Sequence, residues 1–387
     1  MSLTAVLKPN QYADRTVVRI VFVLAVLGIV AVYSALSFLA ETKAGGDLDR
    51  LLLRHVFFVG GGLAAMLVFS RLDYRWTERV AKYGLIMSIV LLVGVLIAGV
   101  AAKGAVRWIR FGTVGFQPSD FARFFLICYV SVLVARKQPY ITDFKRGFLP
   151  ILAWTGVTVL LIGSQNLSTA LLLLATALIV CFIGRVSMAQ IGLLVLGGVL
   201  LGGVMLAVSP ARAARVENYL GVQLFARTDT TAVFDAAAEG YQGRQAEIAF
   251  AMGGLGGVGP GKGVQRDFLP EAYNDFIYAI IGEEYGSLMA LFVLTLFLVL
   301  LYRGYRRIAL AARDPLGYFL AIGMTTTLVL YGFVHAGVNL GLFPVTGLPM
   351  PFVSFGGSSL VTSGAMVGVL LNVSRHRVVA ASASSDA

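Results

Sequence analysis

Long apolar segments recur along the whole chain, separated by short segments that carry most of its charge. A helix that crosses the hydrocarbon core of a bilayer needs ~20 mostly apolar residues. Ten segments meet or approach this length: 17–40, 51–70, 83–102, 119–135, 148–164, 167–184, 190–208, 276–302, 315–340 and 357–374. Because lipid cannot hydrogen-bond the backbone, such segments cross it as helices. The sequence therefore predicts an all-α polytopic integral membrane protein with about ten transmembrane helices.

The composition supports this fold class. The 387 residues are 58% hydrophobic and 13% charged, whereas globular proteins average about 45–50% apolar and about 25% charged residues. This composition excludes a soluble enzyme, a disulfide-stapled secreted module and a disordered regulator. The two cysteines, Cys128 and Cys181, lie inside apolar segments, so we expect buried hydrophobic side chains rather than metal ligands or a redox pair.

The net charge of +11 indicates membrane topology rather than nucleic-acid binding. Ten spans place both termini on one side, whose segments carry 18 of the 31 Lys and Arg residues, against 7 in the short loops opposite. The richer side is expected to be cytoplasmic. We expect one membrane domain over 1–376, a long extracytoplasmic loop over 209–275 between helices 7 and 8, and a short disordered cytoplasmic tail over 377–387.

Acidic residues are concentrated in one window. Of the 20 Asp and Glu residues, ten fall between 209 and 285, which makes this window the first place to look for chemistry. A large solvated loop also collects charge without any chemical role. Elsewhere, the segment 119–135 is the weakest of the ten, because it carries Asp120 and Arg123 near its start.

The stretch 251–286 is rich in glycine. Gly254, Gly256 and Gly259 satisfy G-x-G-x-x-G, but no strand–turn–helix pattern surrounds them, and Gly263 stands where a P-loop needs Ser or Thr. What remains is a backbone that a ligand could approach closely, followed by Lys262 and Arg266 as cations suited to phosphate.

Two carboxylates, Glu271 and Asp275, follow Pro270. If residues 271–275 are helical, both lie on one face at i, i+4; if the next span begins at Asp275, this residue is an N-cap. A carboxylate near the apolar interface can become basic enough to act as a general base. Glu283 and Glu284, inside the following span, are functional candidates or partners of a neighbouring helix.

Two further outer segments hold candidate residues. Arg107 and Trp108 could anchor the chain at the headgroup level or grip an anionic headgroup such as pyrophosphate. The uncharged stretch 341–357 has four Pro or Gly residues between 344 and 351 and predicts a rigid loop covered by protein at membrane depth. His335 and Asn339, at i, i+4, are expected to make interhelical hydrogen bonds.

Several blocks in order resemble the SEDS family of shape, elongation, division and sporulation proteins (FtsW, RodA and SpoVE). They are GFQPSDFAR, the pair Tyr241–Gln242, the glycine-rich run, FLPEAYNDFIYAIIGEEYG and GLFPVTGLPMPFVSFGGSS, and the resemblance extends over about 17–376. The amino-acid sequence of these blocks is most similar to that of the cell-division branch, FtsW. One element departs from the family pattern: where the family carries an aspartate, this chain has Asn166.

The resemblance implies a peptidoglycan glycosyltransferase that polymerises lipid II at the outer face of the bacterial cytoplasmic (inner) membrane, releases undecaprenyl pyrophosphate and pairs with a class B penicillin-binding protein. It assigns the essential loop aspartate to Asp275. In the mechanism we expect, Glu271 either orients Asp275 or holds a metal ion. The expected substrate-binding residues are Arg107, Trp108, Gln242, Lys262, Arg266 and Ser354. A divalent cation, Mg²⁺ or Mn²⁺, is compatible with this chemistry; no nucleotide or nucleic acid is expected.

Two alternatives from other classes stay open on the sequence. A lipid II flippase would bind the same substrate and use the same intramembrane acids, but would form no glycan chains. A scaffold without catalytic activity would recruit the crosslinking partner and tolerate loss of Asp275.

Overall fold

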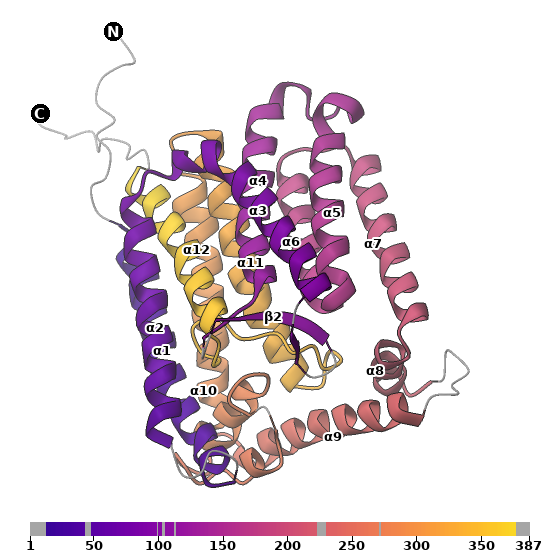
Figure 1. Cartoon of the computed structure of the whole chain (residues 1–387). Helices are drawn as coiled ribbons and strands as arrows, with labels where there is room; N and C mark the ends of the chain where they lie inside the picture. Colours follow the sequence, from indigo (N-terminus) through magenta and orange to yellow (C-terminus); the bar gives the residue numbers. More distant parts are fainter. Residues whose placement is uncertain are drawn as a thin grey trace, which may run out of the picture.

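The computed structural model describes residues 13–42, 48–98, 100–102, 105–111, 114–222, 230–270 and 272–376. Helices stand side by side in one bundle, and a further long helix lies across one end of it, at the bottom of Figure 1. We call this end the outer end and the opposite one the inner end. The Asp14 N–H donates to Ser374 Oγ (3.1 Å), so the two described ends of the chain meet at the inner end.

Each of the ten apolar segments forms a helix. The helices are α1 (Arg15–Thr42), α2 (Leu48–Arg71), α3 (Thr77–Ala98), α4 (Pro118–Lys137), α5 (Leu149–Gln165), α6 (Leu167–Ile183), α7 (Met188–Val208), α10 (Ile277–Tyr302), α11 (Pro315–Asn339) and α12 (Gly357–Arg375). Within the described residues, nine helical stretches are long and apolar enough to cross a membrane, and α6, at 17 residues, is the shorter tenth. The predicted helical membrane fold is confirmed.

Local sequence explains where several of these helices begin. Asn166 accepts the N–H of Thr169 at the start of α6, and Asp314 accepts that of Gly317 at the start of α11. Such caps satisfy N–H groups that have no partner within the helix. Pro118 opens α4 at a position where its missing N–H costs nothing. Asn166 therefore has a structural role, although the family pattern has an acid there.

A small antiparallel sheet departs from the all-α prediction. Strands β1 (Val100–Ala102), β2 (Ala105–Phe111) and β3 (Val114–Phe116) follow α3, which ends at Ala98 rather than running on to residue 102. β2 is rich in Val, Trp, Ile and Phe, which favour strands. The sheet lies below α3 and α4 in Figure 1, towards the outer end.

The segment predicted as a long outer loop, 209–275, contains structure of its own. The short helix α8 (Pro210–Leu220) ends at Gly221, whose φ of 69° is the left-handed conformation common after helix C-termini. The helix α9 (Thr230–Gly253) runs across the outer end (Figure 1).

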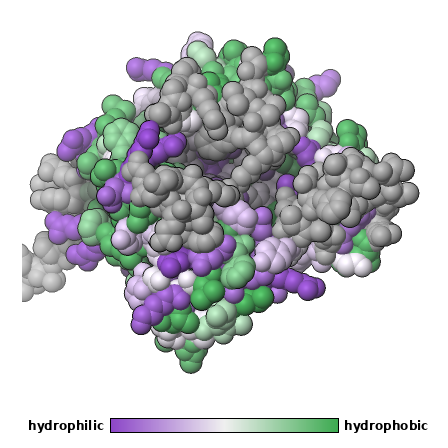
Figure 2. Space-filling model, turned by 60° about the horizontal axis from the view of Figure 1, so that its bottom comes forward, coloured by the Kyte–Doolittle hydropathy of each residue, from purple (hydrophilic) through white to green (hydrophobic). Residues whose placement is uncertain are grey.

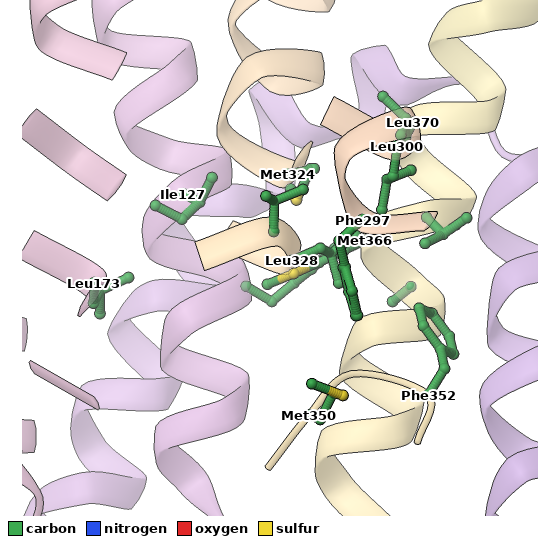
Figure 3. Packing of buried hydrophobic residues seen from close by; sticks show 14 of the residues in the cluster. Ile127, Leu173, Phe297, Leu300, Met324, Leu328, Met350, Phe352, Met366 and Leu370 are labelled. Atoms are coloured by element: carbon green, nitrogen blue, oxygen red, sulfur yellow. The ribbon is translucent and has the colours of Figure 1, made fainter. Parts of the chain in front are cut away.

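The core is built around α11. Ile127 of α4, Phe297 and Leu300 of α10, and Met366 and Leu370 of α12 surround Met324 and Leu328 of α11 (Figure 3). Cys128 and Cys181 are free and fully buried, as predicted. In contrast, only Gln190, Leu194 and Gly198 of α7 are buried, so most of this helix faces outward.

Candidate active site

Asp275 lies in a turn directly before α10. Residues 272–276 form turns, α10 begins at Ile277, and Phe276 occupies the N-cap position. The prediction of a helix over 271–275 is therefore wrong, and so is the alternative that makes Asp275 the N-cap. Glu271 lies outside the described residues, and its predicted role stays a prediction.

The helix α10 is broken at Gly286, whose φ of 81° and ψ of 170° are not helical. The Tyr278 hydroxyl donates to the carbonyl oxygen of Ala290 at 3.1 Å. In a straight helix twelve residues span about 18 Å, so this bond requires a sharp bend. We call residues 277–285 the outer half-helix. The continuing helical stretch runs to Ala309, and 287–309 is still long enough to cross a bilayer.

The glycine-rich run supplies the hydrogen bonds that this break removes. Backbone N–H groups of Val258 and Gly259 donate to the carbonyls of Glu283 and Glu284, and those of Ser287 and Leu288 donate to the carbonyls of Gly254 and Leu255. An irregular backbone at membrane depth needs such partners from protein. The run and the break therefore form one unit.

Two glycines of the run are needed for this contact. A Cβ on Gly253 would lie 2.0 Å from the carbonyl oxygen of Gly282, and one on Gly257 would lie 2.3 Å from that of Glu284. We expected the run to allow close approach of a ligand. At these two positions the close approach is instead to the backbone of α10.

Glu283 and Glu284 are buried and engaged. Glu283 accepts the N–H groups of Val264 and Gln265, and Glu284 accepts the hydroxyl of Ser34 on α1. Of the two alternatives left by the sequence, the structure therefore favours pairing with neighbouring segments over direct chemistry.

The two predicted cations of this loop differ in their surroundings. The Arg266 guanidinium lies 3.0 Å from Ser34 Oγ and 3.7 Å from a Glu284 carboxylate oxygen, so it ties the loop to α1 and α10. Lys262 is exposed on the same loop. Contact with an anionic substrate stays a prediction for both residues, and Lys262 is the more accessible one.

An uncharged loop, 341–356, lies against Asp275. A Cβ on Gly347 would sit 3.5 Å from an Asp275 carboxylate oxygen, so the loop faces that group at Gly347 with room for no more than a small side chain between them. Ser354 Oγ donates to the carbonyl of Asn274 (2.8 Å), and the Phe355 N–H donates to that of Tyr273 (3.0 Å). Leu348 and residues 350–354 of the loop are buried, whereas Leu342 and Phe343 are exposed, so the predicted protein cover holds for the second half of the loop.

Ser354, a predicted substrate-binding residue, instead holds this loop in place. Its side chain is 1% exposed, and its oxygen both donates to Asn274 and accepts the N–H of Met350. The Ser354 hydroxyl thus already acts as both donor and acceptor in hydrogen bonds within the protein. The structure places Ser354 next to the site without exposing it.

The remaining predicted residues come from two other elements. Gln242 lies half-buried on α9, beside Gly243, whose Cβ would be 3.9 Å from Val345 of the loop. Arg107 and Trp108 lie on β2, and their side chains fall outside the described part of the chain. The outer end of the molecule mixes hydrophilic and hydrophobic side chains and is hollowed near its centre (Figure 2).

A buried ionic group behind the loop was not among the predicted site residues. Arg123 lies 3.5 Å from Asp120 and 4.2 Å from the centre of the Tyr331 ring, and Ser358 donates to Asp120 at 2.6 Å. Tyr331 packs against Leu348, the neighbour of Gly347. The sequence did hold a signal for this group. Asp120 and Arg123 lie inside an apolar segment, where charged side chains are costly and are therefore candidates for a functional role.

The described residues contain no group of three His, Cys, Asp or Glu side chains that could hold a metal ion. Glu271 lies outside these residues, and the divalent cation stays a prediction.

The sequence from residue 14 to residue 378 matches the family model of the FtsW, RodA and SpoVE cell cycle proteins. The chain belongs to this family. Two of its relatives are 37% identical to it: the probable peptidoglycan glycosyltransferase FtsW of Geobacter metallireducens, covering 95% of this chain and 96% of the relative, and stage V sporulation protein E of Bacillus subtilis, covering 94% and 97%.

Solved structures of similar proteins agree with the family assignment. One chain belongs to a peptidoglycan synthase complex that coordinates polymerization and crosslinking; it aligns with a TM-score of 0.73 at 26% identity, covering 94% of this chain and 98% of that chain. The rod shape determining protein RodA of Thermus thermophilus aligns with a TM-score of 0.68 at 25% identity, covering 94% and 97%.

Proposed function

We propose that this protein is a peptidoglycan glycosyltransferase that polymerises lipid II at its outer end. The observation that carries the proposal is the position of Asp275, a carboxylate held between the uncharged, partly buried loop 341–356 and the start of a broken helix. Relatives named peptidoglycan glycosyltransferase, similar over nearly the whole chain, support it.

In this mechanism Asp275 is the general base. Its carboxylate takes the proton of the acceptor sugar's 4-hydroxyl, whose oxygen forms a bond to the anomeric carbon of the lipid-linked donor. The bond from that carbon to the pyrophosphate oxygen breaks, with inversion, and undecaprenyl pyrophosphate leaves. Positioned proton transfer contributes roughly 10²–10⁴-fold to such a rate.

Three cations and a helix end are proposed to stabilise the negative charge on the departing pyrophosphate. Lys262, Arg266 and Arg107 are the cations proposed for the pyrophosphate, and the positive end of the outer half-helix begins two residues after Asp275. The apolar outward surface suits the polyprenyl chain. Glu271 is proposed to orient Asp275, and Gln242 and Trp108 to contact the sugar–peptide headgroup.

The test is polymerisation of lipid II by purified protein together with a class B penicillin-binding protein, the proposed partner. Asp275→Asn and Asp275→Ala should abolish glycan chains while the protein still purifies as folded material. Asp49→Asn, an exposed acid at the outer start of α2, is the matched control and should polymerise normally.

Each alternative gives a different result in the same assay. Headgroup translocation in protein-only liposomes without glycan chains would indicate a flippase. Full activity of Asp275→Asn would reject the base assignment, and absence of polymerisation by the wild type with its partner would favour a scaffold. The Mg²⁺ or Mn²⁺ requirement is tested by adding EDTA and then restoring each ion.

A further inference from the structure

The outer half-helix lacks a cap from its own sequence. Phe276 occupies its N-cap position and provides no side-chain hydrogen bond. The first N–H groups of a helix have no partner within it, and leaving them unpaired in a buried place is costly. These first residues are buried, so the partner has to come from protein.

Asn339, the last residue of α11, supplies this partner. Its Oδ1 accepts the Ala279 N–H at 2.9 Å, and the same N–H also donates to the carbonyl oxygen of Phe276 at 3.0 Å. Its Nδ2 donates to the carbonyl oxygens of Asp275 (3.1 Å) and His335 (2.8 Å). Only one assignment of amide oxygen and nitrogen satisfies all these bonds, and Asn339 is fully buried.

The same end of α11 also holds the loop over Asp275. One turn before Asn339, His335 Nδ1 bonds to the carbonyl of Leu348 at 2.6 Å. Leu348 follows Gly347, which faces the Asp275 carboxylate. The α11 end thus fixes the Asp275 backbone on one side and the loop beside its carboxylate on the other.

We propose that Asn339 is a positioning residue for Asp275, capping the outer half-helix from another helix and fixing the carbonyl of Asp275. This inference rests on the proposed function, in which Asp275 is the base. Displacing a reacting group by about 1 Å can cost roughly 10²-fold in rate, so a group that fixes the Asp275 backbone controls kcat more than KM.

The chain offers a matched control in Asn372. This asparagine is also buried, at the inner end, and its amide bridges two backbone groups in the same way: it accepts the Tyr74 N–H (2.9 Å) and donates to the Ser70 carbonyl (3.0 Å). Replacing it removes equivalent bonds at the opposite end of the bundle from the site. It therefore separates loss of fold from loss of positioning.

The experiment compares Asn339→Ala, Asn339→Asp and Asn372→Ala in lipid II polymerisation, with thermal unfolding recorded in detergent. Asn339→Ala should lower kcat by about 10–100-fold with KM changed less than about threefold. Asn372→Ala should lower the melting temperature to a similar extent and keep the wild-type kcat per folded molecule.

Asn339→Asp keeps the oxygen that caps the half-helix, so it should fold, but it replaces the donor to Asp275 with a negative charge. A like charge disfavours ionisation of a neighbouring base, so the acid limb of the pH–rate profile should move to higher pH. Among the described residues, the other titratable or charged groups on the surrounding elements include His335 on α11, Tyr278 on the outer half-helix, Glu247 on α9 beside Gly341, and Arg123 behind Tyr331; the loop 341–356 has none.

Wild-type kcat and pH profile in both Asn339 variants would overturn the inference, as would a loss of activity no greater than that of Asn372→Ala. These outcomes leave the proposed function intact. The proposed function fails separately, if the wild-type protein with its partner makes no glycan.

Discussion

Single glycines decide how the glycine-rich run packs, and neighbouring positions should respond differently to the same change. Gly257 has a φ of 81°, and an added Cβ would meet the carbonyl of Glu284 at 2.3 Å, whereas one on Gly256 would meet nothing within 4 Å. Gly257→Ala should therefore cost about 2 kcal/mol or more of stability. Gly256→Ala should unfold at the wild-type temperature. Equal melting temperatures in detergent would contradict the backbone contact.

At this scale the sequence offered candidate residues, but it did not predict the local structure around them. Asp275 could be singled out because it is a carboxylate at the mouth of an apolar segment. Neither proposed conformation around it was right, because the helix start depends on Asn339, 64 residues away in the chain. Contacts of this kind leave no local pattern in the sequence.

At the scale of elements, apolar length predicted the helices well because lipid imposes it. The break in α10 was missed for the opposite reason. The segment 276–302 is long and apolar enough for one straight span despite Glu283 and Glu284, and the backbone bonds that stabilise the break come from residues 254–259. The small sheet was missed because its first strand continues an apolar segment without interruption.

One acid joins two elements at the inner end and should make stability depend on pH. Asp314 accepts the Gly317 N–H that starts α11, the Tyr74 hydroxyl (2.7 Å) and the Arg75 guanidinium (3.1 Å) from the turn between α2 and α3. Burial alone would raise the pKa of Asp314, but these hydrogen bonds outweigh it and hold the pKa below its usual range. Asp314→Ala should cost about 1–2 kcal/mol at pH 7.

The direction of the pH effect follows from that lowered pKa. A carboxyl group that is more acidic in the folded than in the unfolded protein stabilises the fold above its unfolded pKa, about 3.9, and loses this effect as the pH falls further. The melting difference between wild type and Asp314→Asn should therefore be full at pH 7 and shrink below about pH 4. The control is Asp143→Asn, which removes a cap within its own segment. A melting-temperature difference between wild type and Asp314→Asn that stays constant down to about pH 3 would contradict the role of Asp314 in joining the two elements.

At the scale of the whole molecule, side-chain bonds tie distant segments at both ends of the bundle, and the outer end adds backbone contacts. At the inner end Arg303 lies 2.7 Å from Asp14. At the outer end Arg266 and Glu284 bond to Ser34 of α1, and backbone groups of the loop 341–356 and the glycine-rich run close the end. A site at the outer end can thus sit near lipid-linked substrate while the inner ends of α1, α10, α11 and α12 stay fixed.

This division makes an orientation prediction that single cysteines can test. Cys128 and Cys181 are fully buried, so the wild type should not react with a membrane-impermeant maleimide. Gly256 is exposed at the outer end and Arg313 at the inner end. The excess of Lys and Arg on the inner side predicts that it faces the cytoplasm, so Gly256→Cys should label in intact spheroplasts and Arg313→Cys only after permeabilisation. The reverse pattern would place Asp275 on the cytoplasmic side, where a base for polymerising lipid II at the outer face could not act.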